Sequence, residues 1–164
     1  MTTALEIAPL TPEAFVPYGQ VIETANAEQI PINQGTTTRF HDLADINVAS
    51  EGGKPLISIF RSQPRPQPIR LEVMERHPLG TQAFYPLQDR PWLLVVSNAD
   101  DPLDPAGLKA FRASGIQGVN YARNIWHHPL LVLEPDSDFL IVDRGGEGDN
   151  LEEVWFSEDV TLIP

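Results

Sequence analysis

Three polar side chains lie close together in an otherwise apolar stretch, residues 74–86. Glu75 and His77 are two residues apart, so in a strand their side chains point to the same face. Gln82 follows just after a bend that a proline and a glycine predict. A carboxylate, an imidazole and an amide held at one bend predict a polar pocket. Carboxylate and imidazole are groups that transfer protons or bind metal ions.

The strand that would carry this pair is predicted by alternation along residues 69–77. Three apolar residues share the face of Glu75 and His77, namely Ile69, Leu71 and Val73. The other face is predicted to hold Arg70, Glu72, Met74 and Arg76. The two polar groups therefore end a core-facing row, which is how the mouth of a barrel or cleft is lined.

A second polar corner is predicted at residues 118–129, which contain two of the four histidines, His127 and His128. If His127 points inward, alternation places Tyr121, Arg123 and Ile125 on its face. By the same alternation, the side chains of Trp126 and Arg76 point away from the face of His127 and His77. We expect both residues to be structural or to contact a second subunit. A buried or surface role without chemistry is the alternative for any single histidine, but His77 and His127 each end an apolar strand.

Composition narrows the class of protein. The chain of 164 residues is predicted to form one domain, and it carries 11 basic and 23 acidic residues, a formal charge of −12. This balance argues against binding to nucleic acid or to an anionic membrane, and no stretch is apolar enough to span a bilayer. With no cysteine and no signal-peptide pattern at the start, we expect a cytoplasmic protein.

Short apolar runs and frequent turns predict a mainly β fold, a cupin-like antiparallel β-barrel or jelly roll with a few short helices. A short helix is expected from Thr11 and a longer one over residues 104–112, capped by Asp104. Residues 24–38 are expected to form a loop. Strands are expected at residues 19–23, 39–42, 56–61, 69–77, 91–96, 130–134, 139–143 and 154–156.

The two corners resemble cupin motifs. The spacing from His77 to Gln82 is that of the first motif, with Glu75 where a histidine is usual and Gln82 where a glutamate is usual. Residues 123–127 resemble the second motif, a turn before one histidine. Over nearly the whole chain the sequence resembles the ureidoglycolate lyase family, on residues 75–84, 118–121, 123–124, 126–129 and 143–146, with 18–19 and 39–44.

This resemblance implies a homodimer that splits ureidoglycolate into glyoxylate and urea during allantoin breakdown. It implies no organic cofactor, and a divalent metal, suggested to be nickel, in some members. Glu75, His77 and His127 are the candidate acid–base residues, or the ligands of such an ion.

The remaining candidates would bind substrate. Arg61 and Arg123 would hold the carboxylate, although a surface salt bridge is the alternative for each. Gln82 and Asn124 suit the urea group, which needs both donors and acceptors. Tyr121 is expected to line the same site, because alternation places it on the same face as His127.

Two other functions fit the residues. One is a metal-dependent cupin enzyme that acts on another small hydroxy acid or a sugar. The other is a barrel that binds a small molecule without catalysis. The departures at Glu75 and Gln82 count against the first.

Overall fold

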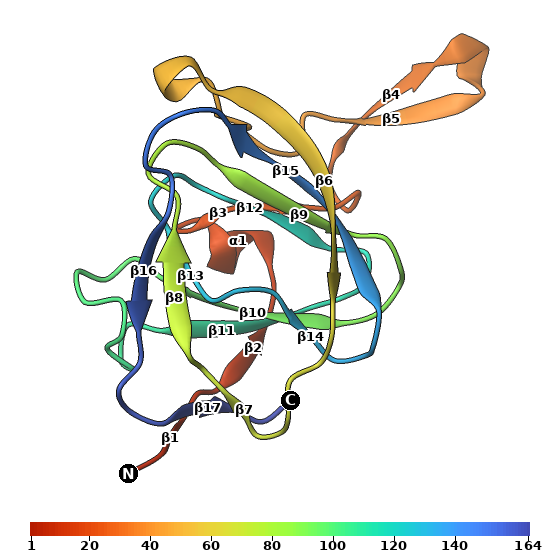
Figure 1. Cartoon of the computed structure of the whole chain (residues 1–164). Coiled ribbons are helices and arrows are strands. Elements are labelled where there is room, and N and C mark those ends of the chain that lie inside the picture. Colours follow the sequence, from red (N-terminus) through yellow and green to blue (C-terminus); the bar gives the residue numbers. More distant parts are fainter.

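Two sheets, largely antiparallel, face each other across the main core of the computed structural model, which describes residues 1–164 (Figure 1). One sheet has five strands in the order β3-β12-β9-β15-β6. Their bounds are β3 Gly19–Ile22, β12 Gly118–Tyr121, β9 Gln82–Pro86, β15 Ser137–Gly145 and β6 Lys54–Ser62. This sheet supplies Phe84, Val119 and Ile141 to the core.

The facing sheet has seven strands in the order β16-β8-β13-β10-β11-β2, with β14 also paired to β10. Their bounds are β16 Glu152–Trp155, β8 Val73–Arg76, β13 Trp126–His127, β10 Trp92–Ser97, β11 Lys109–Ala113, β2 Ile7–Pro9 and β14 Leu131–Val132. The fold is thus mainly β, as predicted, although the strand pairings leave separate sheets and form no closed barrel.

Strand β10 is buried on both faces, which explains its unbroken apolar sequence. Trp92, Leu94 and Val96 pack in the core between the two large sheets. Leu93 and Val95 belong to a second apolar cluster on the opposite face. Residues of a small three-stranded sheet also contribute to this second cluster: β1 Thr3–Ala4, β17 Val160–Leu162 and β7 Ile69–Arg70.

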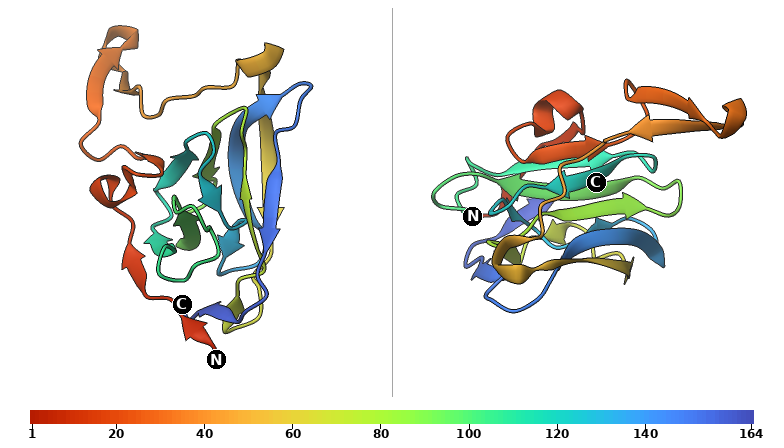
Figure 2. Two further views of the ribbon diagram at one scale, coloured as in Figure 1. Left: turned by 90° about the vertical axis from the view of Figure 1, so that its left-hand side faces the viewer. Right: turned by 90° about the horizontal axis from the view of Figure 1, so that it is seen from above.

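A hairpin projects away from the rest of the chain in every view (Figure 2). It consists of β4 Glu28–Ile32 and β5 Thr37–His41, joined by a 3-10 turn at Asn33–Gly35. The prediction of a loop over residues 24–38 was therefore wrong for residues 28–32 and 37–38, because polar strand residues that pack on no core carry no apolar pattern. A second 3-10 turn, Ser50–Gly52, precedes β6.

The helix predicted over residues 104–112 was wrong. Asp104 does accept the backbone N–H of Ala106, but it does so within a tight turn, and residues 109–113 form β11 instead. Pairing with β10 and burial of Phe111 override the local helix signal. The helix predicted from Thr11 is confirmed as α1, Pro12–Phe15, with Thr11 accepting the N–H of Ala14.

The strand predicted over residues 69–77 is interrupted, since β7 and β8 pair in different sheets. Ile69, Leu71 and Val73 are buried as expected, but so is Met74, which was assigned to the outer face. Met74 lies opposite Val154 of β16 and packs in the second apolar cluster. Arg76 and Trp126 were predicted to point to the same outer face, and they do. The guanidinium of Arg76 lies 4.5 Å from the ring centre of Trp126, which is buried beneath it.

Candidate active site

The two polar segments, residues 74–86 and 118–129, come together on the neighbouring strands β8 and β13. Glu75 on β8 is the register partner of His127 on β13, and His77 follows directly after β8. One ligand atom from each of Glu75, His77 and His127 lies within 4.8 Å of the others. The ring centres of the two histidines are 5.2 Å apart. The structure therefore brings together the three residues that sequence spacing singled out.

His127 is almost fully buried, and its ring is held on two sides. Its Nδ1 lies 3.0 Å from the carbonyl oxygen of Ile125, and its ring stacks on Tyr121 with centres 4.2 Å apart and planes 7° apart. Its Nε2 lies 3.4 Å from Oε1 of Glu75 without making a hydrogen bond. The ring is thus fixed while one nitrogen atom is left free beside a carboxylate.

His77 lies between two oxygen atoms. Its Nδ1 is 2.8 Å from the backbone oxygen of Asn150, and its Nε2 is 3.0 Å from Oε1 of Gln82. Asn150 also accepts the N–H of Leu79 through its side chain, which ties the turn after His77 to the segment between β15 and β16. The orientation of this imidazole is therefore set by two neighbouring segments.

Gln82, at the start of β9, contacts more than His77. Its Nε2 donates to Oδ2 of Asp143 on β15 at 3.1 Å. Neither Asp143 nor Asn150 was assigned a role from the sequence. Asp143 had a usable signal, because it ends the core-facing row Phe139, Ile141, Asp143 in the way that Glu75 ends its own row. Asn150 contacts His77 through its backbone oxygen, and its residue type does not predict that contact.

Burial and neighbouring charges shift the pKa values of Glu75 and His77. Burial raises the pKa of Glu75, but the contact with His127 and the field of the neighbouring histidines outweigh it, so the pKa of Glu75 is lowered. Burial and the charge of His127 lower the pKa of His77, against the raising effect of the Asn150 carbonyl and Glu75. Burial strongly raises the pKa of Tyr121, so its hydroxyl stays protonated. At neutral pH the site holds a carboxylate beside a histidine that loses its proton readily.

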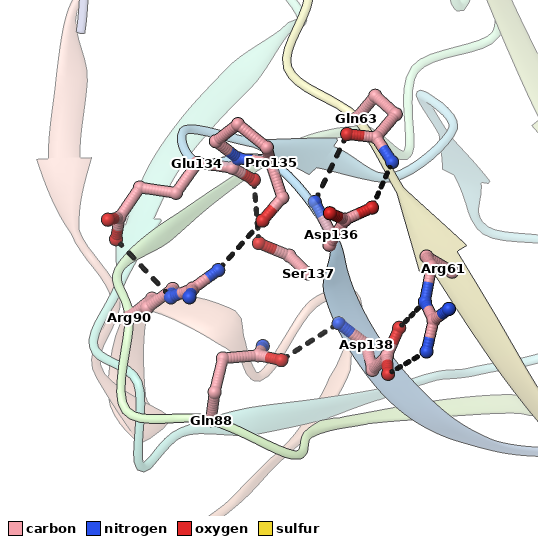
Figure 3. A network of polar contacts seen from close by, with 9 residues as sticks. All are labelled: Arg61, Gln63, Gln88, Arg90, Glu134, Pro135, Asp136, Ser137 and Asp138. Atoms are coloured by element: carbon pink, nitrogen blue, oxygen red, sulfur yellow. Dashed lines mark hydrogen bonds and ion pairs between the residues drawn. The ribbon is translucent and has the colours of Figure 1, made fainter.

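The two arginine candidates differ in position. Arg61 lines a cavity of about 440 Å³ together with Glu75, Phe60 and Phe84. Its guanidinium also donates to both carboxylate oxygens of Asp138, at 2.8 and 3.0 Å (Figure 3), so the alternative of a surface salt bridge is present as well. The carboxylate of Asp138 explains why the pKa of Arg61 is raised.

Arg123 and Asn124 lie in an exposed turn before β13. Arg123 donates two hydrogen bonds to the carbonyl oxygen of Pro78, at 3.2 and 2.9 Å, and forms no hydrogen bond or ion pair with the three clustered residues. Asn124 has a φ of 63°, a conformation that asparagine tolerates, and its N–H donates to the backbone oxygen of His77. In this structure both residues support the segment of His77.

The donor set fits a divalent transition metal. Two imidazoles and one carboxylate are ligands that such ions accept, and Nε2 of His127 is buried without a hydrogen-bond partner. His77 fits less readily, because both of its ring nitrogens already face oxygen atoms.

Comparison with known proteins decides the family. The family model described as "Ureidoglycolate lyase" matches residues 2–163. The chain belongs to the ureidoglycolate lyase family. A ureidoglycolate lyase of Burkholderia mallei is 57% identical over 164 residues, covering 96% of both chains. A ureidoglycolate lyase of Brucella anthropi is 58% identical over 159 residues, covering 97% of this chain and 94% of that one.

Membership of the ureidoglycolate lyase family makes this chain an enzyme of the lyase class, and it disfavours both alternative functions. Among solved structures, a 3,4-ketoisomerase from Helicobacter canadensis is similar with a TM-score of 0.47 and 11% identity, over 79% of this chain and 85% of that one. No helix of the structure has the length and apolarity needed to cross a membrane.

Proposed function

We propose that this chain cleaves ureidoglycolate to glyoxylate and urea, in the breakdown of allantoin from purines. The observation that carries the proposal is the cluster of Glu75, His77 and His127, within 4.8 Å of one another, in a chain of the ureidoglycolate lyase family. The family gives the substrate, and the cluster supplies the groups that the reaction needs.

The reaction requires two proton transfers. Ureidoglycolate carries a hydroxyl, a ureido nitrogen and a carboxylate on one carbon. A base removes the hydroxyl proton, the oxygen forms a carbonyl, the carbon–nitrogen bond breaks, and an acid protonates the leaving nitrogen. No water is consumed. Glu75, His77 and His127 are the acid–base residues, and assistance of this kind contributes roughly 10²–10⁴-fold to a rate.

Substrate binding is assigned to the residues around the cluster. Arg61 would hold the substrate carboxylate, because it shares a cavity with Glu75. Tyr121 would form part of the wall of the site by its stacking on His127. The turn residues Arg123 and Asn124 and the amide of Gln82 remain candidates for the carboxylate and the urea group.

A divalent ion, with nickel as the candidate, would be held by Glu75, His77 and His127. When bound, it would polarise a substrate oxygen as a Lewis acid.

The enzyme is proposed to be a cytoplasmic homodimer. Strand β6 lies at the edge of its sheet and exposes apolar side chains, including Ile57 at 75% and Ile59 at 62%. An uncovered apolar edge strand favours pairing with another strand, and antiparallel pairing with its own copy would be symmetric. Light scattering on the purified chain and on Ile57→Lys tests this, with a dimer expected for the first and a shift to monomer for the second.

Product analysis tests the reaction itself. The purified chain is incubated with each ureidoglycolate enantiomer, and glyoxylate, urea and ammonia are quantified together. We expect equal amounts of glyoxylate and urea from one enantiomer. Ammonia in place of urea would move the enzyme to the amidohydrolases, and binding without turnover would support the non-catalytic alternative.

A further inference from the structure

The cavity that contains Glu75 has an apolar side. It has a volume of about 440 Å³ and is lined by seven residues. Four of them present apolar side chains, namely Phe60, Phe84, Pro129 and Leu130. The two phenylalanine rings pack edge to face with their centres 6.0 Å apart, and Phe60 is still 40% exposed. The cavity therefore offers an aromatic wall that a ligand can reach from solvent.

Three polar side chains complete the lining: Arg61, Ser62 and Glu75. The guanidinium of Arg61 uses Nε and Nη2 to bind Asp138, which leaves Nη1 for the carboxylate of a ligand. Glu75 belongs to the acid–base cluster, which the substrate hydroxyl has to approach. The side chain of Ser62, a half-buried residue of β6, forms no hydrogen bond within the chain. Its hydroxyl is therefore available to donate to a carbonyl oxygen of a ligand.

These contacts direct the far end of the ureido group to the apolar wall. When Arg61 takes the carboxylate and Glu75 faces the hydroxyl, the third substituent of the same carbon points to the rest of the lining. The ureido carbonyl can accept from Ser62, but the terminal NH₂, which needs acceptors, meets Phe60 and its apolar neighbours. The amide of Gln82 provides no acceptor in their place, because both of its ends are already bonded.

We propose that this enzyme also cleaves N-acyl-α-hydroxyglycines, compounds in which an alkyl or aryl group replaces the terminal NH₂ of ureidoglycolate. The inference rests on the proposed lyase function and extends its substrate class. The carboxylate, the hydroxyl, the nitrogen and the carbonyl are the same in both kinds of compound. Only the replaced group differs, and it lies on the wall of Phe60 and Phe84, where burial of apolar surface is favourable.

The size of the cavity fits this wider class. Sites for drug-sized ligands have volumes of roughly 300–1,000 Å³. Ureidoglycolate is much smaller than such ligands, so a cavity of about 440 Å³ has room for an aryl group beyond the ureido carbonyl. The exposure of Phe60 keeps this end of the cavity open to solvent.

The bonds that form and break are those of the ureidoglycolate reaction. A base removes the hydroxyl proton, and the oxygen forms the carbonyl of glyoxylate. The carbon–nitrogen bond breaks with its electron pair on nitrogen, and an acid protonates that nitrogen. The products are glyoxylate and a primary carboxamide. No water, oxidant or reductant takes part.

Cleavage of racemic N-benzoyl-α-hydroxyglycine by the purified chain tests the proposal, with glyoxylate and benzamide quantified together. We expect equal amounts of the two products and a KM about tenfold lower than for ureidoglycolate, the lower end of what a hydrophobic pocket contributes. In Phe60→Ala, the kcat/KM for the benzoyl compound relative to that for ureidoglycolate should fall by about tenfold. The control Ile116→Ala removes another exposed apolar side chain, outside the cavity, and should leave this ratio unchanged.

Binding of two analogues that lack the hydroxyl examines the wall without turnover. N-Carbamoylglycine and N-benzoylglycine cannot undergo the cleavage, so calorimetry measures their affinities directly. We expect the benzoyl compound to bind about tenfold more tightly, and this preference to be lost in Phe60→Ala.

The outcomes separate this inference from the proposed function. Cleavage of ureidoglycolate alone would overturn only the wider substrate class. An unchanged ratio of kcat/KM in folded Phe60→Ala would remove the aromatic wall from acyl recognition. Cleavage of neither compound would overturn the lyase function itself.

Discussion

Strand β15 connects two aspartate–glutamine pairs that look alike and differ in what they leave free. Directly before β15, Asp136 accepts a hydrogen bond from Nε2 of Gln63 at 2.7 Å, and the side-chain oxygen of Gln63 in turn accepts the backbone N–H of Asp136 (Figure 3). Near its end, Asp143 accepts Nε2 of Gln82, but the oxygen of Gln82 faces His77. The first pair is closed on itself and exposed. The second passes its orientation on to a half-buried imidazole.

The difference shows that the effect of an aspartate–glutamine contact depends on what the other end of the glutamine amide faces. For Gln82 this is His77, and for Gln63 it is the backbone of Asp136 itself. The outer pair lies among other exposed contacts, including Arg61 with Asp138 and Arg90 with Glu134 (Figure 3), and such surface interactions contribute little. The inner pair lies where burial shifts the pKa of His77 and of Glu75. We therefore expect substitutions near the inner pair to change chemistry and those at the outer pair to change almost nothing.

The largest expected effect is that of His77→Ala. If His77 is one of the acid–base residues, its loss should lower kcat for glyoxylate release by about 10²–10⁴-fold, and His77→Asn should lower it similarly, because an amide does not take up or release a proton at neutral pH. Circular dichroism verifies folding. A wild-type rate in folded His77→Ala would remove His77 from the reaction.

The next prediction concerns buried His128, whose shifted pKa makes the stability of the fold depend on pH. Burial lowers the pKa of His128 from 6.5 to about 4, against the raising effect of the Pro129 carbonyl. Between these values the unfolded chain binds the extra proton, so the stabilisation is complete above about pH 6.5 and is lost as the pH falls toward 4, by roughly 3 kcal/mol.

Urea unfolding at several pH values measures this contribution. We expect His128→Gln to flatten the curve between about pH 4 and 6.5, whatever its own cost in stability. Asp136→Asn should leave the shape of the curve unchanged. An unaltered slope in His128→Gln would assign the pH dependence to other groups.

A smaller effect is expected for metal binding. Glu75→Gln removes the carboxylate beside the free Nε2 of His127, so titration calorimetry with Ni²⁺ should show an affinity lower by at least about tenfold. Equal affinities in Glu75→Gln and the unsubstituted protein would exclude Glu75 as a ligand. Activity of the protein after chelation, with its metal content verified, then shows whether the ion is needed.

The mainly β fold and the grouping of Glu75, His77 and His127 could be predicted from local patterns, because alternation along residues 69–77 and a turn before His127 are both encoded nearby in the chain. The helix expected after Asp104 could not be corrected locally, since the competing signal is pairing with β10, a contact across the sheet. The projecting β4–β5 hairpin has no apolar face to reveal it. Sequence spacing placed Glu75 and His77 but could not show that β9 and β15 join Gln82 to Asp143, a pair 61 residues apart.

The smallest expected effect belongs to the outer pair. Asparagine replaces aspartate at position 136 with the same shape and tolerates its φ of 53°. Asp136→Asn should therefore keep the wild-type kcat and unfolding midpoint.

A side-by-side measurement of kcat for Asp143→Asn and Asp136→Asn tests the central claim most directly. Both variants exchange the carboxylate of an aspartate for an amide opposite a glutamine side chain. We expect the kcat of Asp143→Asn to be lower by at least about tenfold and that of Asp136→Asn to be unchanged, with both proteins folded. Equal kcat values in the two variants would contradict it.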